Sequence, residues 1–306
     1  MGTANISNGP WIDEMLRAHA RWMRGESSNG RCILDAATLN GCNLTGADLQ
    51  AAIMRSATFL DAELSDAKFG NAIIDAADFE RSLLARTDFA EAHISESNFA
   101  FSLMMEAALA DARVRNTGFR KANLRNARWP GALLENCKFT EAELQDASFH
   151  HARVALCDFS ASDFTAAQFV RAQIEGCRFL AANGPDANFS SGRIKGCDFA
   201  RTDLAGARFF QADLTGSQFD RTRLREADLR EAQLNGVILC QADLSGARLG
   251  GAMLLAADLR DANLTGAREL SAAQLAQALT DRNTILPNGS RGPYRRNSGA
   301  ERAAAR

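Results

Sequence analysis

The chain has 306 residues, with 35 basic and 37 acidic side chains and a formal net charge of -2 at pH 7. A charge this close to balance excludes a protein that binds nucleic acid or an anionic membrane through its overall charge. Only one Tyr and five Pro accompany 18 Phe. A conventional globular core draws more evenly on Val, Ile and Tyr, so the composition indicates a repeating architecture.

The first predicted element is an amphipathic helix within residues 1–31. In "PWIDEMLRAHARWMR", residues 10–24, apolar side chains recur at helical spacing, Pro10 suits the first turn and Gly25 suits the C-cap. A flexible linker follows it. No basic segment followed by an apolar core precedes the helix, so no secretory signal is predicted. No apolar stretch approaches the roughly 20 residues that a bilayer span requires.

Residues 32–268 form one uninterrupted repeat. A large apolar residue occurs at 46 of the 47 positions that lie five apart from Leu34 to Leu264, and the exception is Gly184. The residue two positions earlier is small almost everywhere. A period of five fits neither a helix nor a strand. It predicts a chain that turns a corner every five residues and sends one large and one small side chain inward on each side.

The large residues also sort into four columns at intervals of twenty. Each column collects like residues, which predicts four sides per coil and coils stacked at the strand spacing of about 4.8 Å. One column contains only phenylalanine: Phe59, Phe79, Phe99, Phe119, Phe139, Phe159, Phe179, Phe199 and Phe219. We expect these nine residues to form the structural core.

Four cysteines lie twenty residues apart in the column of small inward positions: Cys137, Cys157, Cys177 and Cys197. A buried free cysteine usually behaves as a small apolar residue. Neighbours about 4.8 Å apart with parallel side chains suit neither a disulfide nor tetrahedral zinc. We therefore expect core packing, with no metal and no cofactor. Free buried thiols also favour a reducing compartment, the cytoplasm.

Two surface sets are candidates for binding a partner. The apolar set, Leu83, Phe101, Leu103 and Met105, points outward on an otherwise polar repeat, which often marks a contact. The alternative is that the N-terminal helix covers it.

The acidic set is Asp61, Glu63, Asp66, Asp78 and Glu80. It belongs to residues 32–110, which carry twelve acidic and four basic side chains. Such an end could face a basic groove, or it could be a solubilising surface.

The last elements are a short helix and a tail. Residues 269–286 are predicted to form a C-terminal cap with a helix over about 272–280, because Ser271 and Gln274 make a capping box. Both terminal helices are expected to cover the open ends of the coil, where backbone groups would otherwise be bare. The basic tail, residues 287–306, is predicted to be disordered.

The phrases "CNLTGADLQAA", "LREADLREAQL" and "ADLRDANLTGA" resemble the pentapeptide-repeat family, whose consensus is Ala-(Asp/Asn)-Leu-X-X. The resemblance covers about residues 32–268. It implies an all-β solenoid, a right-handed quadrilateral parallel β-helix of about twelve coils, with short helical caps at both ends. Members of the family that bind DNA gyrase imitate a DNA duplex through shape and negative charge. This chain lacks their inserted loops and their strongly acidic character.

The function expected from the sequence is a non-enzymatic, rigid scaffold for a protein partner of unknown identity. The alternatives are a DNA-mimicking modulator of DNA gyrase or another type II topoisomerase, and a secreted effector. No constellation of catalytic residues and no glycine-rich phosphate loop occurs in the repeat. Neither direct nucleic-acid binding nor membrane binding is expected, and a homodimer through a terminal helix stays an option.

Overall fold

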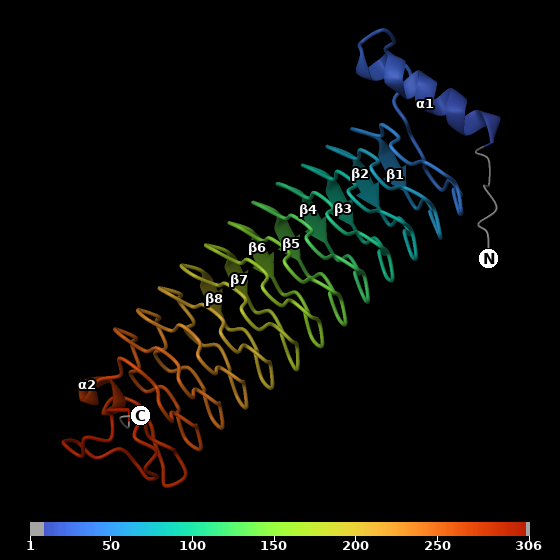
Figure 1. Cartoon of the computed structure of the whole chain (residues 1–306). Helices are drawn as coiled ribbons and strands as arrows, with labels where there is room; N and C mark the ends of the chain where they lie inside the picture. Colours follow the sequence, from blue (N-terminus) through green and yellow to red (C-terminus); the bar gives the residue numbers. More distant parts are fainter. Residues whose placement is uncertain (1–8, 304–306) are drawn as a thin grey trace. The chain divides into compact units, whose positions relative to one another are not determined.

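The structure, a computed structural model, describes residues 9–303 and divides into two compact units, unit 1 (Met1–Ser148) and unit 2 (Phe149–Arg306). Unit 1 opens with helix α1 (Pro10–Met23), which is followed by coils (Figure 1). Its regular strands are β1 (Ile53–Arg55), β2 (Ile73–Asp75), β3 (His93–Ser95), β4 (Arg113–Arg115) and β5 (Leu133–Glu135). Unit 2 contains β6 (Arg153–Ala155), β7 (Gln173–Glu175), β8 (Arg193–Lys195) and helix α2 (Ala272–Leu275).

Within each unit, successive coils pair in parallel with a register of twenty residues. In unit 1, β1 to β5 pair in sequence order, and Ile53 lies opposite Ile73. The other three sides of a coil are joined by isolated parallel bridges, such as Thr38 to Thr58, Asn43 to Glu63 and Asp48 to Lys68. Four bridges per twenty residues confirm the four-sided parallel β-solenoid.

Regular strand is less extensive than the sequence suggests. Three-residue strands form on one side of eight coils only, whereas 47 five-residue units on four sides predict about twelve coils. On the other sides isolated bridges hold the coils together.

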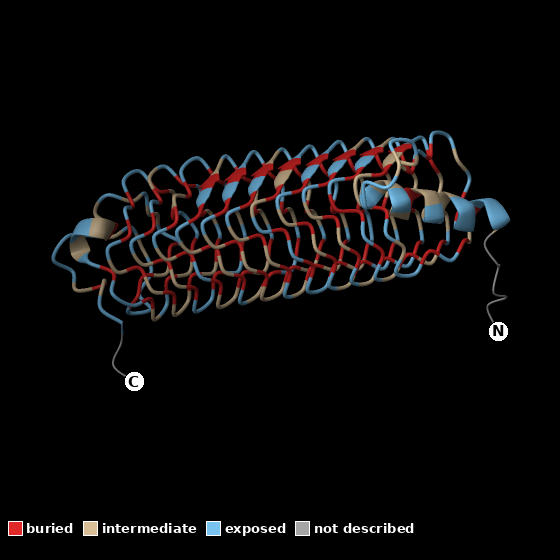
Figure 2. Cartoon of the chain, turned by 90° about the horizontal axis from the view of Figure 1, so that it is seen from above, coloured by how far each residue is buried: buried red, intermediate tan, exposed pale blue. Residues whose placement is uncertain are grey.

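Stacked phenylalanine rings form part of the interior of both units. In unit 1 the centroids of Phe59 and Phe79 lie 4.7 Å apart with an interplanar angle of 2°, and the stack continues to Phe139. In unit 2 the separations from Phe159 to Phe219 are 4.5–4.8 Å. These separations match the spacing between strands. Buried residues accordingly line the inside of the coils, and exposed ones lie on the corners and outer faces (Figure 2).

Gly184, the one break in the large-residue series, is explained by its neighbour in unit 2. A Cβ atom at Gly184 would lie 1.9 Å from Cε2 of Phe164, one coil earlier. The Phe164 ring is fully buried and meets Phe169, Phe179 and Phe189 edge-on. The oversized ring therefore uses the space that a leucine would fill in the next coil.

Helix α1 packs against the first coil of unit 1. Ile12 and His19 are buried, and Gly30 in the linker lies so close to the helix that a Cβ atom there would be 2.7 Å from the Ala18 carbonyl oxygen. The side chain of His19 bonds to the backbone of the coil at Gln50 and Cys32. The part of the segment 1–31 before residue 9 lies outside the described residues.

The C-terminal elements differ from the prediction. The capping box of Ser271 and Gln274 is present, but α2 ends at Leu275 instead of continuing to residue 280. The chain then resumes the coil: the Leu259 amide donates to the Leu279 carbonyl at 2.8 Å, and the Leu264 amide to the Ile285 carbonyl at 2.8 Å. Residues 276–286 thus belong to the solenoid, because the open edge of the preceding coil offers them hydrogen bonds.

The tail is folded as far as the structure describes it, which corrects the prediction of disorder for residues 287–306. The Tyr294 amide donates to the Thr280 hydroxyl at 2.9 Å, and the Tyr294 hydroxyl donates to Glu301 at 3.1 Å. Ala300 is buried. These contacts attach residues 287–303 to the end of unit 2, so their polar composition does not leave them without structure.

Candidate protein-binding surface

An apolar cluster lies on the outer surface of unit 1. Leu83, Phe101 and Leu103 are 37%, 42% and 39% exposed. Leu83 and Leu103 are bridge partners in adjacent coils, each flanked by buried inward-facing residues, so both side chains point outward. Phe101 occupies the corner before Leu103 with a left-handed φ of 60°. Met105, at the next corner, is only half-exposed. We call these four residues the apolar cluster.

Two cations flank the aromatic member of this cluster. The Arg120 guanidinium carbon lies 5.6 Å and the Lys121 amine 5.9 Å from the centroid of the Phe101 ring. Both cations also bind Glu141, at 3.0 and 3.2 Å, and the resulting hydrogen bonds from Lys121 and Arg120 hold the pKa of Glu141 below its usual range. Cations over an aromatic face are attracted by its quadrupole. Phe101 is therefore held in place although no core packing surrounds it.

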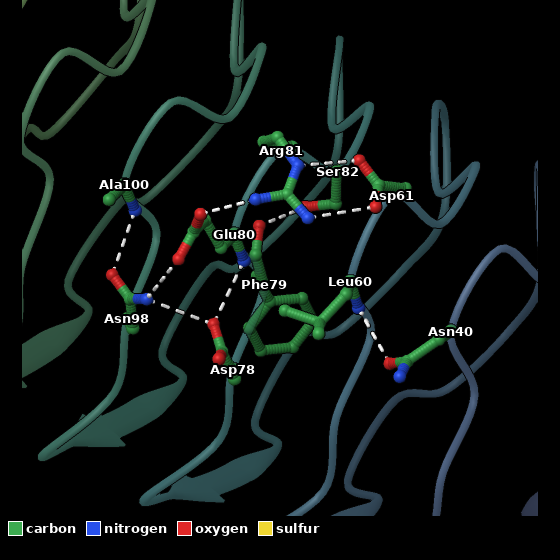
Figure 3. A network of polar contacts seen from close by, with 10 residues as sticks. All are labelled: Asn40, Leu60, Asp61, Asp78, Phe79, Glu80, Arg81, Ser82, Asn98 and Ala100. Atoms are coloured by element: carbon green, nitrogen blue, oxygen red, sulfur yellow. Dashed lines mark hydrogen bonds and ion pairs between the residues drawn. The ribbon is translucent and has the colours of Figure 1, made fainter.

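The acidic set is largely paired with arginine. In the network of Figure 3, the Arg81 guanidinium donates to both carboxylate oxygens of Asp61, at 2.8 and 3.0 Å, and also binds Glu80. Arg86 binds Asp66 in the same bidentate way, at 2.7 and 2.6 Å. Hydrogen bonds from these arginines lower the pKa of Asp61 and of Asp66. The pairs with Asp61 and Asp66 join residues twenty apart, so in both the arginine lies one coil further along.

The two remaining acids lie in different surroundings. Asp78 accepts hydrogen bonds from the backbone amide of Glu80 and from the Asn98 side chain, both at 3.0 Å. Glu63 is the bridge partner of Leu83. The acidic set and the apolar cluster therefore meet in one outward column, in which Glu63, Leu83 and Leu103 follow each other from coil to coil.

The cysteine column is buried in both units. The Cys177 thiol accepts a hydrogen bond from the Cys157 amide at 3.4 Å and donates towards the Val154 carbonyl at 3.4 Å. Contact with the Cys177 thiol and burial raise the pKa of Cys197. Among residues 9–303, no group of three or more His, Cys, Asp or Glu residues is placed to hold a metal ion. The described thiols thus pack as small side chains.

No sequence pattern pointed to a groove of about 780 Å³ near the end of unit 2. Arg225, Glu226 and Arg268 line it together with glycine corners and Ala303 of the tail. Arg268 reaches across two coils to bind Glu226, and Arg225 binds Asp243 at 2.5 Å. The folded tail forms one wall, which the sequence did not predict.

No helix in the described part of the chain is long and apolar enough to cross a bilayer.

Comparison with known proteins agrees with the geometry. A family profile of the pentapeptide repeat region matches residues 72–149 and 132–209, and a profile of eight pentapeptide repeats matches residues 32–71, 202–241 and 242–279. A search of curated protein sequences gives no match.

Three solved structures illustrate the likeness. HetL, a pentapeptide repeat protein involved in heterocyst differentiation regulation in the cyanobacterium Nostoc sp. strain PCC 7120, is 21% identical, with 89% of this chain and 98% of HetL covered and a TM-score of 0.30. Full-length QnrB1, a plasmid-mediated fluoroquinolone resistance protein, is 21% identical, with 58% and 93% covered and a TM-score of 0.29. A pentapeptide repeat protein from the thylakoid lumen of Arabidopsis thaliana is 28% identical, with 35% and 68% covered and a TM-score of 0.15. Because the family profiles follow one another from residue 32 to residue 279 along a four-sided parallel solenoid, the chain belongs to the pentapeptide-repeat family.

Proposed function

We propose that this protein is a non-enzymatic scaffold that binds a protein partner through the apolar cluster of unit 1. The observation that carries the proposal is the shared exposure of Leu83, Phe101 and Leu103 on adjacent coils. Contiguous exposed apolar groups on a polar surface mark interaction sites. Aromatic anchors supply much of the binding energy in such contacts.

The cations around Phe101 support the same proposal. Arg120 and Lys121 flank the ring and are themselves neutralised by Glu141. The ring is thus ordered before binding, which reduces the side-chain entropy that a partner would have to remove. The rigid coil beneath keeps Leu83 and Leu103 at fixed spacing. A partner with an apolar surface that accepts one aromatic side chain fits this arrangement.

A scaffold role also agrees with the groove of unit 2. An enzyme site is usually a mostly apolar concavity with a few convergent polar groups. In the groove near Arg225 the arginines already bind carboxylates, Arg225 that of Asp243 and Arg268 that of Glu226. The buried free thiols support our placing of the scaffold in the cytoplasm, since reducing compartments keep thiols unpaired.

The test compares Phe101→Ser with a matched control, Leu255→Ser, which replaces a 61% exposed leucine at a corner of unit 2. Each tagged protein is used to capture partners from a cell extract at two salt concentrations, with mass spectrometry as the readout. We expect Phe101→Ser to remove partners that wild type and Leu255→Ser retain, with little effect of salt. Identical partner sets for all three proteins, at unchanged circular dichroism, would contradict the proposal.

A second candidate function is modulation of DNA gyrase or another type II topoisomerase by a DNA-like acidic surface. It is favoured by the excess of eight negative charges in residues 32–110. The pairing of Asp61, Asp66 and Glu80 with arginine leaves less free charge than the sequence suggests. A supercoiling assay with purified gyrase tests this candidate. Inhibition or protection that disappears with salt and with Asp61→Asn, Glu63→Gln and Asp66→Asn combined would support it over the apolar cluster.

A further inference from the structure

Helix α1 is attached to the first coil of unit 1 through one buried histidine. The His19 side chain is fully buried, with Nε2 2.9 Å from the Gln50 carbonyl oxygen and Nδ1 3.0 Å from the Cys32 amide nitrogen. A backbone amide can only donate, so Nδ1 must be the acceptor. Nε2 then carries the single ring proton and donates it to Gln50. The surroundings thus select one neutral tautomer of His19.

The Gln50 carbonyl belongs to the open edge of the solenoid. In later coils the equivalent carbonyls accept from the preceding coil, as that of Gly70 does from the Ala51 amide at 2.8 Å. The first coil has no preceding coil, and the imidazole takes its place as the donor to the Gln50 carbonyl. The imidazole also accepts from the Cys32 amide, whose equivalent in the next coil, the Ala52 amide, donates within its own coil to the Leu49 carbonyl at 3.0 Å. Buried backbone groups without partners are costly, so this pair of bonds gives α1 its position on the coil.

Few other polar contacts secure the helix. In the part of the chain that the structure describes, the nitrogen and oxygen hydrogen bonds between α1 and the coils are the two of His19. Apolar and aromatic contacts complete the attachment: Trp22 stacks on His19 with centroids 5.5 Å apart, and Arg31 lies 5.6 Å from the Trp22 ring. Met15 meets the Cys32 thiol at 3.4 Å. Among the described residues, the nitrogen and oxygen hydrogen bonds of this attachment therefore depend on the protonation state of His19.

We propose that α1 is an acid-released cap: a second proton on His19 places an N–H donor at Nδ1 against the Cys32 amide, breaks that bond and frees the helix from the first coil. The donor-to-donor contact cannot be relieved by flipping the ring, because Gln50 and Cys32 demand one acceptor and one donor on opposite sides. Release frees the Gln50 carbonyl and the Cys32 amide of the first coil, the two backbone groups that His19 binds.

The charged neighbours of His19 do not cancel this effect. Burial lowers its pKa, the bond to Gln50 and the Asp48 carboxylate act in the opposite direction, and Arg31 lowers it further. The Cys32 thiol stays neutral, because burial raises its pKa to about 12. Free histidine has a pKa of about 6.5. Docking is therefore complete above that pH and weakens as the pH falls through it, because the undocked state binds the proton more tightly. Between pH 7.5 and 5.5 the docking equilibrium constant should fall about tenfold.

Hydrogen exchange of the full chain measures this directly, after correction for the intrinsic effect of pH on exchange. An isolated helix of this length is marginal in water, so undocked α1 exchanges freely. We expect protection of the peptide that spans residues 10–32 to fall about tenfold from pH 7.5 to 5.5, while peptides around β3 stay unchanged. Equal protection of residues 10–32 at both pH values would overturn the proposal.

Two variants isolate the histidine. His19→Gln offers one acceptor and one donor but no titrating group, so α1 should stay protected at both pH values. His93→Gln changes an exposed histidine of β3 in the same unit and should keep the wild-type response. A pH response that persists in His19→Gln would show that another group controls the docking of α1 and would contradict the proposal. If His19→Gln fails to dock at pH 7.5, the pKa of His19 in the wild-type chain, measured by NMR, decides instead: a value at or above that of free histidine contradicts the proposal.

Discussion

Unit 2 contains two stretches of solenoid with the same register and different interiors. From Phe149 to Phe219 phenylalanine rings stack at 4.5–5.0 Å and meet the neighbouring columns edge-on. From Leu224 to Leu264 every large inward residue is leucine, equally buried. The parallel bridges keep their spacing of twenty through both stretches. The coil therefore does not require phenylalanine: leucine at the inward positions supports the same shape, and the aromatic columns add packing energy to it.

The largest expected effect is a loss in the free energy of unfolding when one buried side chain is truncated in each stretch. Phe179→Ala removes a ring that stacks on Phe159 and Phe199, and it should lower the free energy of unfolding by about 3–5 kcal/mol. Leu244→Ala in the leucine stretch should cost about 2–5 kcal/mol. We expect the first to exceed the second by about 1 kcal/mol, the added contribution of ring stacking. Urea denaturation of both variants checks this, and equal losses would show that stacking adds nothing.

An intermediate effect on stability is expected in the column where Phe164 stands among leucines. Gly184→Leu places side-chain atoms in the space of the Phe164 ring and should destabilise unit 2 by about 1–3 kcal/mol. The double variant Phe164→Leu with Gly184→Leu converts the pair to the pattern of the leucine stretch. It should recover most of the thermal stability. Independent, additive losses in the two single variants and the double variant would mean that the two sites do not share a space.

The smallest effect concerns the cysteine column. Alanine occupies the equivalent small inward position at Ala257 in the leucine stretch. Cys177→Ala removes one small buried group and the long hydrogen bond from the Cys157 amide, and it should therefore cost only about 1 kcal/mol. Circular dichroism and thermal melting with and without a chelator provide the measurement. A large loss of stability, or stoichiometric zinc in the wild-type protein, would assign the column a role beyond packing.

The coil could be predicted because its signal is purely periodic. A large apolar residue recurs at almost every fifth position, and like residues recur at every twentieth. The register of twenty therefore follows from residues such as Phe59 and Phe79 without knowledge of distant contacts. The arginine pairs of the acidic set carry a readable signal as well, since Asp61 and Arg81 are twenty residues apart. Once the register is known, opposite charges at that spacing are expected to meet.

The ends could not be predicted in the same way. The sequence favoured a helix to residue 280 because "SAAQLAQALT" is rich in helix formers. The open edge of the last coils overrides this propensity, since Leu279 and Ile285 gain backbone bonds there. His19 has the spacing of an ordinary apolar-stripe residue. Its partners are backbone groups of Gln50 and Cys32, and no side-chain pattern encodes their positions.

The register of twenty also determines how a gene for such a chain can change length. Removal of one complete coil, for example residues 92–111 of unit 1, would join Glu91 to Ala112 and leave every later phenylalanine in its own column. Removal of five residues would instead turn all later positions by one side of the square, so that Phe99 would continue the column of Ile74. Insertions and deletions are therefore expected in whole coils, each of which lengthens or shortens a unit without altering its cross-section.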